Sequence, residues 1–130
     1  MSFTYRIEPG LLHVFVEGAV TQAERIEAMR SWMADPDFHP GLNTLCDLSK
    51  AQSTPTLTEL HALVDFLNQH ADRLGRKKLA LVTAKPVTFG VARQFAVLAE
   101  SSPLDVQVFS SREAALSWLH SQSPTSTPSG

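Results

Sequence analysis

The order of apolar and polar residues divides the chain into short strand-like and longer helix-like segments. Alternating or continuous apolar runs, typical of strands, occupy residues 3–8, 11–17, about 43–48, 79–83 and 106–109. Apolar residues at helical spacing follow the second strand and each later strand. The pattern therefore predicts five strands and four helices in the order ββαβαβαβα.

Start and stop signals place the ends of these helices. Three capping boxes mark helix starts: Thr21 with Glu24, Thr56 with Glu59, and Ser110 with Glu113. Pro36 stops the first helix, and Gly75 is a natural stop for the second, which we expect to run to about Leu74. The third helix is expected to span about residues 87–100.

The connections predict the arrangement of the sheet. Pro9-Gly10 is a turn signal, so the first two strands should form an antiparallel hairpin. Helices separate the later strands, which favours parallel pairing with right-handed crossovers. Residues 79–83 are continuously apolar, as in a central parallel strand. We therefore expect an α/β fold with a mixed, mostly parallel five-stranded sheet and helices packed on it.

Length and composition limit the class of protein. A chain of 130 residues with 43% hydrophobic residues predicts one domain over residues 1–120. Residues 121–130 contain Ser, Thr and Pro without a hydrophobic residue, and we expect a disordered tail. A net charge of −2 gives no basic footprint for nucleic acid. No segment approaches the roughly 20 apolar residues of a membrane span.

Cysteine usage and the first residues indicate the compartment. The opening sequence MSFTYRIEPG lacks the apolar core of a secretory signal. The single cysteine, Cys46, cannot form an internal disulfide and fits a reducing cytoplasm. Because Cys46 lies in an apolar strand, we interpret it as an inert core thiol. A cytoplasmic protein is the expectation.

The segment NTLCDLSKAQSTPTLTEL, residues 43–60, is the first candidate site. A buried strand ends there, a loop rich in hydroxyl groups follows, and a capped helix begins. Hydroxyls near the positive end of a helix could hold a phosphoryl group, another anion or a partner. The alternative is purely local: Asp47 caps backbone N–H groups, Ser49 begins a turn and Thr56 is an N-cap. The candidates are Asp47, Ser49, Ser53, Thr54 and Thr56.

The segment KPVTFGVAR, residues 85–93, is the second candidate site. It gathers Lys85, Thr88 and Arg93 around a helix start, which could form an anion-binding corner. Gly90 costs about 1 kcal/mol in a helix relative to alanine. Close packing or a close ligand would explain its presence. The segment is not a phosphate loop, because the required glycine and Lys-Ser/Thr spacing is absent.

Metal and covalent chemistry have little support in the sequence. The five histidines are scattered without Cys or His neighbours at ligand spacing, so we expect neither a metal site nor a cofactor. No nucleophile–base pair is evident. Phe15 interrupts the polar face of the second strand, so we expect something to cover part of that face. Phe15 and the hairpin edge also offer surfaces for a homodimer.

Several segments give the chain a family resemblance. Over residues 3–119 it resembles the STAS domain family, in particular the small bacterial SpoIIAA-like (STAS/SEC14-like) branch. The segments that carry the likeness are DPDFHPG, LCDLS, FGVARQF and VQVFSSREAALSWL. The resemblance implies a βα superhelix with the strands in sequential order. In antagonist members of the family, an anti-sigma kinase phosphorylates a serine in an Asp-Ser-Ser-Gly motif, and this switches partner binding. Pro55-Thr56 stands at the Asp-Ser position here, so only the Thr56 hydroxyl carries over.

The residues and the resemblance together lead to two functional hypotheses. The first is a non-enzymatic, STAS-like regulatory module that binds a protein partner, with signalling and anti-sigma-type proteins as candidates. The alternative is a carrier of a small molecule or lipid, with an apolar pocket near the third helix.

Overall fold

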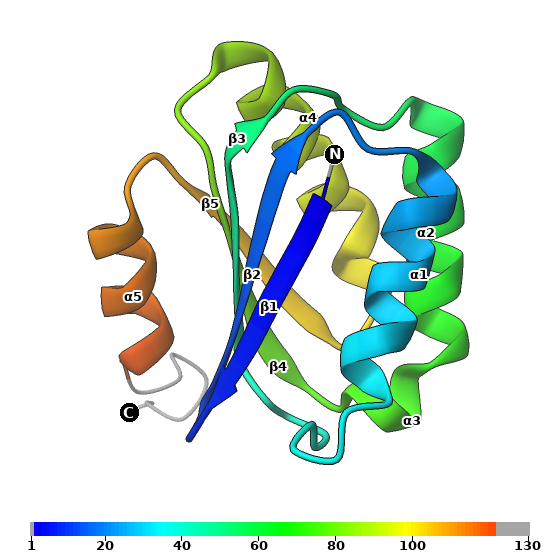
Figure 1. The fold of residues 1–130 in the computed structure, drawn as a ribbon, viewed down its shortest axis with the longest axis vertical. Helices are drawn as coiled ribbons and strands as arrows, with labels where there is room; N and C mark the ends of the chain where they lie inside the picture. The colour runs from blue at the N-terminus through cyan, green and yellow to red at the C-terminus, as the bar shows by residue number, and fades with distance from the viewer. Residues whose placement is uncertain (1, 122–130) are drawn as a thin grey trace.

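The protein consists of one sheet between two helical layers. The computed structural model describes residues 2–121. Three helices, α1, α2 and α4, cover one face of the sheet, and the last helix, α5, covers part of the other (Figure 1). The predicted tail falls mostly on residues 122–130, which lie outside the described range. Its first residue, Ser121, is the C-cap of α5.

The elements follow the predicted order, with two short additions. The strands are β1 (Ser2–Glu8), β2 (Leu11–Gly18), β3 (Thr44–Ala51), β4 (Lys77–Val82) and β5 (Leu104–Phe109). The helices are α1 (Gln22–Met33), α2 (Leu57–Gln69), α3 (Ala71–Leu74), α4 (Pro86–Leu98) and α5 (Arg112–His120). A 3₁₀ turn, η1 (Ala99–Ser101), follows α4.

The sheet confirms the predicted topology. Its strand order is β1-β2-β3-β4-β5, and only β1 runs antiparallel to its neighbour. The hairpin pairs Glu8 with Leu11, and Gly10 adopts φ 81°, which a glycine tolerates without strain. The strand at residues 79–83 lies inside the sheet as β4, between β3 and β5.

Each face of the sheet carries its own hydrophobic core, because successive strand residues point to opposite faces. In β2, Leu12 and Val14 pack toward α1 and α2. Leu11, with Leu45 of β3, packs instead against Ala115 and Leu119 of α5. Full burial of one leucine contributes about 1.5–3 kcal/mol, so both cores stabilise the fold.

Lys78 fastens α5 to the sheet. Its Nζ donates hydrogen bonds to the carbonyl oxygens of Trp118 (2.9 Å) and Ser121 (3.1 Å), at the end of α5. The ammonium group also lies 5.2 Å from the centre of the Trp118 ring. A cation at a helix C-terminus satisfies carbonyls that have no partner within the helix.

Three local expectations were wrong. Ser111, not Ser110, is the N-cap of α5 and accepts a hydrogen bond from the Ala114 N–H (3.1 Å). The second helix divides at His70 into α2 and α3, although Gly75 ends the pair as predicted. A Cβ added to Gly90 would meet no atom within 4 Å outside its own helix and chain neighbours, so close packing does not explain this glycine.

Candidate functional site

The carboxyl ends of β3 and β4 meet at one end of the molecule. The two strands are parallel neighbours, so the loops leading to α2 and α4 emerge side by side. Lys85 connects them, because its Nζ donates to the Ala51 carbonyl at the end of β3 (2.8 Å). The starts of α2 and α4 both lie at this end, at the top of Figure 1. In open α/β sheets, ligands bind at such carboxyl ends.

The two helix starts expose apolar side chains. Leu57, the first residue of α2, is 53% exposed, and Val87, the second residue of α4, is 72% exposed. Among large apolar residues in the described range, only Val97 shares this degree of exposure. We call Thr56, Leu57, Lys85 and Val87 the helix-start surface. Its apolar part could not be predicted from the sequence, because the exposure of a residue at a helix start depends on what packs around it.

In the loop between β3 and α2, which contains Ser53, Thr54 and Thr56, hydroxyl groups form hydrogen bonds with the backbone. The Ser53 hydroxyl accepts from the Val20 N–H (2.9 Å) and donates to the Val20 carbonyl (3.2 Å). Thr56 forms the predicted capping box with Glu59, which receives the Thr56 N–H at 3.0 Å. Thr54 lines a cavity described below. Ser53 therefore ties the loop after β3 to the segment before α1, and Thr56 caps the start of α2.

Asp47 and Ser49 point to the other face of the sheet, toward α5. One carboxylate oxygen of Asp47 accepts both the backbone N–H (2.9 Å) and the hydroxyl of Ser49. The second oxygen lies 3.5 Å from Nη1 of Arg112, at the start of α5. The local role of Asp47 is thus present, together with an ion pair that sequence analysis missed. The proximity of Arg112 to Asp47 could have been inferred from the topology, because β3 and β5 are parallel and the residues that follow them lie at the same end of the sheet.

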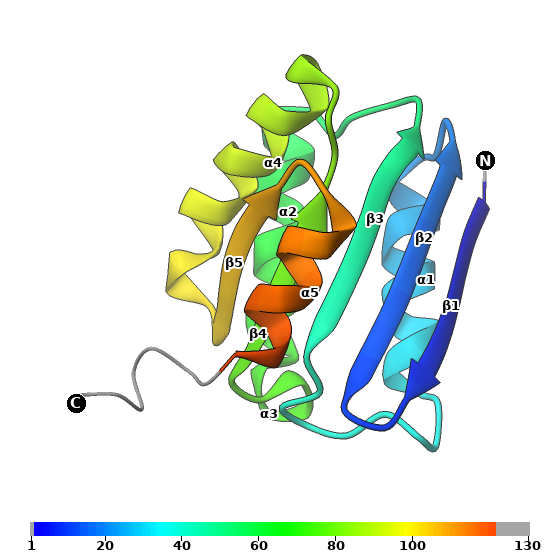
Figure 2. The ribbon, with the colours of Figure 1, turned by 90° about the vertical axis from the view of Figure 1, so that its left-hand side faces the viewer.

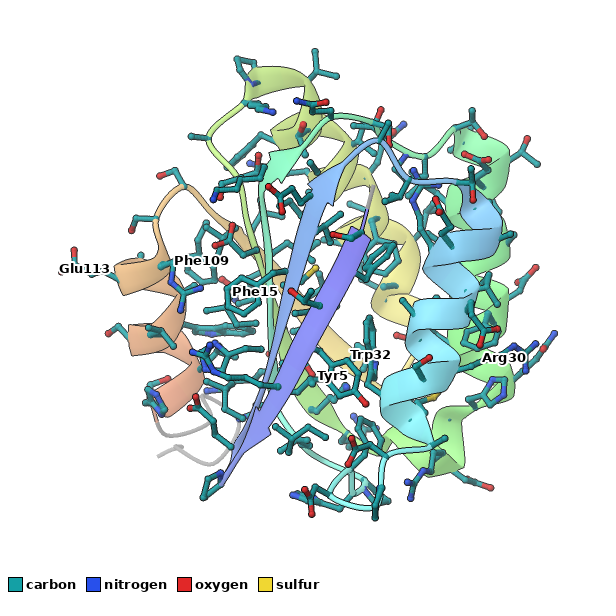
Figure 3. All side chains as sticks on the ribbon, in the orientation of Figure 1. Tyr5, Phe15, Arg30, Trp32, Phe109 and Glu113 are labelled. Atoms are coloured by element: carbon teal, nitrogen blue, oxygen red, sulfur yellow. The ribbon has the colours of Figure 1, made fainter. Side chains whose placement is uncertain are left out.

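Two arginines cover Phe15 on this face. Figure 3 shows Phe15 and Phe109 on the α5 side of the sheet, whereas Tyr5 and Trp32 lie on the α1 side. The guanidinium groups of Arg6 and Arg112 lie 5.5 and 5.6 Å from the Phe15 ring centre. Cation–π contacts of this kind shield the ring. Homodimerisation through this face stays a prediction.

His13 is buried beside Phe15. It is 4% exposed, its ring stacks on the Phe15 ring, and its Nε2 lies 3.4 Å from Glu8. Its Nδ1 has no hydrogen-bond partner in the described structure. Burial lowers the pKa of His13, and the nearby Glu8 carboxylate partly opposes this effect. The ring is therefore predominantly neutral at pH 7.

The residues of the second candidate site do not converge. Lys85 is exposed at the start of α4. Thr88 is buried and lines the cavity under α4, whereas Arg93 lines a groove at the outer edge of the sheet. The predicted anion-binding corner would need these three side chains on one side of the helix.

An apolar cavity of about 180 Å³ lies between the sheet and helices α1, α2 and α4. Residues from all of these elements line it, including Val14, Met29, Trp32, Cys46, Leu63 and Phe95. Polar side chains are few, with Arg25, Thr54 and Thr88 among them. The side chains of α4 that line it are Thr88, Val91, Ala92 and Phe95.

Two polar groups that line the cavity, the Arg25 guanidinium and the Cys46 thiol, differ in their hydrogen bonding and protonation. Arg25 is bound to its surroundings, since its guanidinium donates to Gln22 (3.1 Å) and to the Val20 carbonyl (3.3 Å). Burial lowers the pKa of Arg25, and the Glu59 carboxylate at 3.5 Å opposes this effect. Burial raises the pKa of the Cys46 thiol to about 12, with a contribution from Asp47, so the thiol stays protonated at pH 7.

Residues 2–121 contain no group of three His, Cys, Asp or Glu side chains placed to hold a metal ion. None of the helices in this range is long and apolar enough to cross a membrane.

Known proteins resemble this chain in structure rather than in sequence. No family model matches it. Likewise, no curated protein matches its sequence. An uncharacterised DUF3478-family protein with a SpoIIAA-like fold from Shewanella loihica PV-4 superposes with a TM-score of 0.59 at 15% identity, over 91% of this chain and 92% of its own. An anti-sigma factor antagonist from Mycobacterium paratuberculosis gives a TM-score of 0.58 at 17% identity, over 92% and 94%. The chain therefore has the SpoIIAA-like α/β fold that the resemblance predicted.

Proposed function

We propose that the protein is a non-enzymatic, cytoplasmic regulatory module that binds a protein partner through the helix-start surface. The observation that carries the proposal is the exposure of Leu57 and Val87 at the starts of two helices that follow parallel, neighbouring strands. The fold shared with an anti-sigma factor antagonist supports the same class of function. Each exposed apolar side chain lies close in sequence to a polar one, Leu57 to Thr56 and Val87 to Lys85, which suits a partner surface that combines apolar and acidic groups.

Aspartate substitutions test this surface without threatening the fold. Positions 57 and 87 lie in the first turns of their helices, where a negative charge is favourable by about 0.3–1 kcal/mol. A double variant, Leu57→Asp with Val87→Asp, should therefore fold while it loses an apolar contact region. Ala62→Asp is the matched control, because Ala62 is exposed on the body of α2.

The readout is quantitative capture of proteins from the native cells with tagged wild type and both variants. We expect a protein that wild type and Ala62→Asp enrich equally and that the double variant loses. Its direct binding to purified wild-type protein should then be measured by calorimetry. If the double variant binds this protein as tightly as wild type does, the helix-start surface is not the binding site.

The apolar cavity favours a second candidate function, the carriage of a small apolar compound. At about 180 Å³ the cavity is smaller than typical sites for drug-sized ligands, which span about 300–1,000 Å³. Apolar cavities of about 150 Å³ bind benzene. A single ring or a short acyl group therefore fits this cavity, whereas a complete lipid does not.

Benzene and hexanoate are suitable probes of the carrier function. Ala92 lines the cavity and is 5% exposed, so Ala92→Leu should fill part of it. We expect at least one probe to raise the melting temperature of wild type and neither to affect Ala92→Leu. Unchanged melting of wild type with both probes would exclude this function.

A further inference from the structure

The outer edge of β5 forms a groove together with α4. The groove has a volume of about 380 Å³, and β5 residues from Leu104 to Val108 form one wall. The other wall is a stripe of α4 and η1 that contains Phe89, Arg93, Ala96, Val97 and Glu100. Figure 2 shows α4 beside β5 and extending past this edge of the sheet. Among residues 2–121, no strand pairs with β5 on this side.

The backbone of β5 has hydrogen-bonding groups that point into this groove. On the side that faces β4, the Phe109 carbonyl accepts a hydrogen bond from the N–H of Thr83 (3.0 Å), and the Pro103 carbonyl accepts one from the N–H of Lys77 (3.4 Å). Because alternate residues of a strand direct their backbone groups to the same side, odd-numbered residues of β5 face β4. The N–H and C=O groups of Val106 and Val108 therefore face outward.

We propose that this groove binds an extended peptide segment of a partner protein, which adds to the sheet as a sixth strand. Main-chain hydrogen bonds to Val106 and Val108 would supply the register of such a strand. Its side chains on the α4 side would pack on Val97, which is 64% exposed, and on Phe89. The site is separate from the helix-start surface, and the proposal does not depend on the proposed function.

The groove favours a single strand over a second copy of this chain. In a two-fold pair of β5 strands, each α4 would have to extend over the other protomer's β5. The space over that strand is already occupied by the other protomer's own α4. A lone extended segment carries no helix and fits beneath the stripe.

Asp105 indicates the sequence of the strand. Its side chain is exposed on the sheet face opposite α4, since Leu104 and Val106 point to the α4 side. The described structure gives Asp105 no ion pair or side-chain hydrogen bond. A lysine or arginine opposite Asp105 would therefore form a favourable cross-strand pair. The expected ligand has valine-like residues at alternate positions and a basic residue between two of them.

The probe is the peptide acetyl-Thr-Val-Thr-Val-Lys-Val-Thr-amide, titrated to millimolar concentration into ¹⁵N-labelled protein. In antiparallel pairing its central valine lies opposite Val106 and its lysine opposite Asp105. We expect shifts of the Val106 and Val108 amides and slower hydrogen exchange at both. N-methylation of the central valine removes one main-chain donor and should abolish these effects.

Two exposed positions provide protein variants whose spectra also verify folding. Val97→Asp should weaken binding by placing a charge against the peptide's apolar face. Asp105→Lys should weaken binding of the lysine peptide about two- to fivefold. It should strengthen, by a similar factor, binding of a peptide in which glutamate replaces that lysine. A reversed charge preference would tie the peptide to the predicted register.

Three results would overturn the proposal. The first is the absence of shifts at Val106 and Val108 with the lysine peptide. The second is equal binding of the N-methylated peptide, which would show that the main chain takes no part. The third is protection of these amides that rises with protein concentration alone and accompanies dimerisation in sedimentation, because a second copy would then occupy the edge.

Discussion

Val87 and Val97 belong to the same helix and are both largely exposed, at 72% and 64%, yet they lie on two different surfaces. Val87 stands beside the carboxyl ends of β3 and β4, whereas Val97 lines the groove beside β5. One helix thus presents an apolar side chain to each proposed binding region. Substitutions at the two positions should affect binding independently, because they share no contact region.

Thr56 separates a capping role from a role in binding. The Thr56 hydroxyl accepts the Glu59 N–H at 3.1 Å, so Thr56→Ala should cost about 1 kcal/mol and Thr56→Ser almost nothing. Thr56→Glu places a favourable negative charge at the helix start, so stability should survive while partner capture falls. Thermal melts beside capture experiments check this. If Thr56→Glu changes neither the melting temperature nor partner capture, Thr56 is not part of the binding surface.

Gly75 should not tolerate a side chain. Its backbone has φ 67° and ψ 174°, a region essentially limited to glycine. An added Cβ would also lie 2.7 Å from the Gly41 nitrogen and 3.0 Å from the Pro40 Cβ. Strain of this kind costs about 1–3 kcal/mol before the steric overlap is counted, so Gly75→Ala should lower the midpoint of urea unfolding. Gly90→Ala is the control, because it meets open space in a helix and should be stabilising.

Lys77 should make stability rise with pH in mildly alkaline solution. Burial lowers its pKa from an ordinary value of 10.5 to about 8, and within residues 2–121 its Nζ donates one hydrogen bond, to the Thr44 hydroxyl (3.1 Å). Between these values the unfolded chain binds the proton and the folded chain does not, so unfolding becomes less favourable as pH rises. Above about pH 9 the raised pKa of Cys46 acts in the opposite direction.

The comparison of wild type with Lys77→Met isolates this effect. The free energy of unfolding of wild type relative to Lys77→Met should increase by a few kcal/mol from pH 8 to about 10.5. Denaturant unfolding at a series of pH values gives this difference. A difference that stays constant over the range would show that Lys77 keeps an ordinary pKa in the folded protein.

His13 should destabilise the fold in acid. Its pKa is lowered in the folded state, so the unfolded chain binds the proton first as pH falls through about 6.5. Wild type should therefore lose stability between about pH 6.5 and the folded-state pKa. His13→Leu removes the buried, unpaired Nδ1 and should lose less stability over this interval. Parallel acid-induced losses in both proteins, followed by circular dichroism, would contradict this role of His13.

The fold could be predicted because local signals agree with the sheet topology. The Pro9-Gly10 turn, the alternation of strands with capped helices and the apolar run at residues 79–83 each favour the observed order. The choice between Ser110 and Ser111 as the N-cap of the last helix was harder to make from the sequence. Ser110 has the better capping-box spacing, but β5 continues to Phe109, and the helix begins one residue later, after Ser111.

The sites depended on contacts that local patterns do not encode. Asp47 and Arg112 are 65 positions apart, and only the meeting of parallel strand ends brings them together. Thr88 and Arg93 look like members of one corner in sequence, yet the helix directs them to different cavities. The apolar cavity could not be predicted from the sequence either, since the residues that line it have the composition of an ordinary core.

Site-specific photo-cross-linking tests the central claim most directly. A benzophenone-bearing residue would be placed at position 57, 87 or 62 of the full chain, and each protein would be irradiated in the native cells. The account predicts one shared cross-linked partner from positions 57 and 87 and none from position 62, since Leu57 and Val87 are exposed at the same end of the molecule. Equal cross-linking of that partner from position 62, or different partners from 57 and 87, would contradict a single partner site at the helix-start surface.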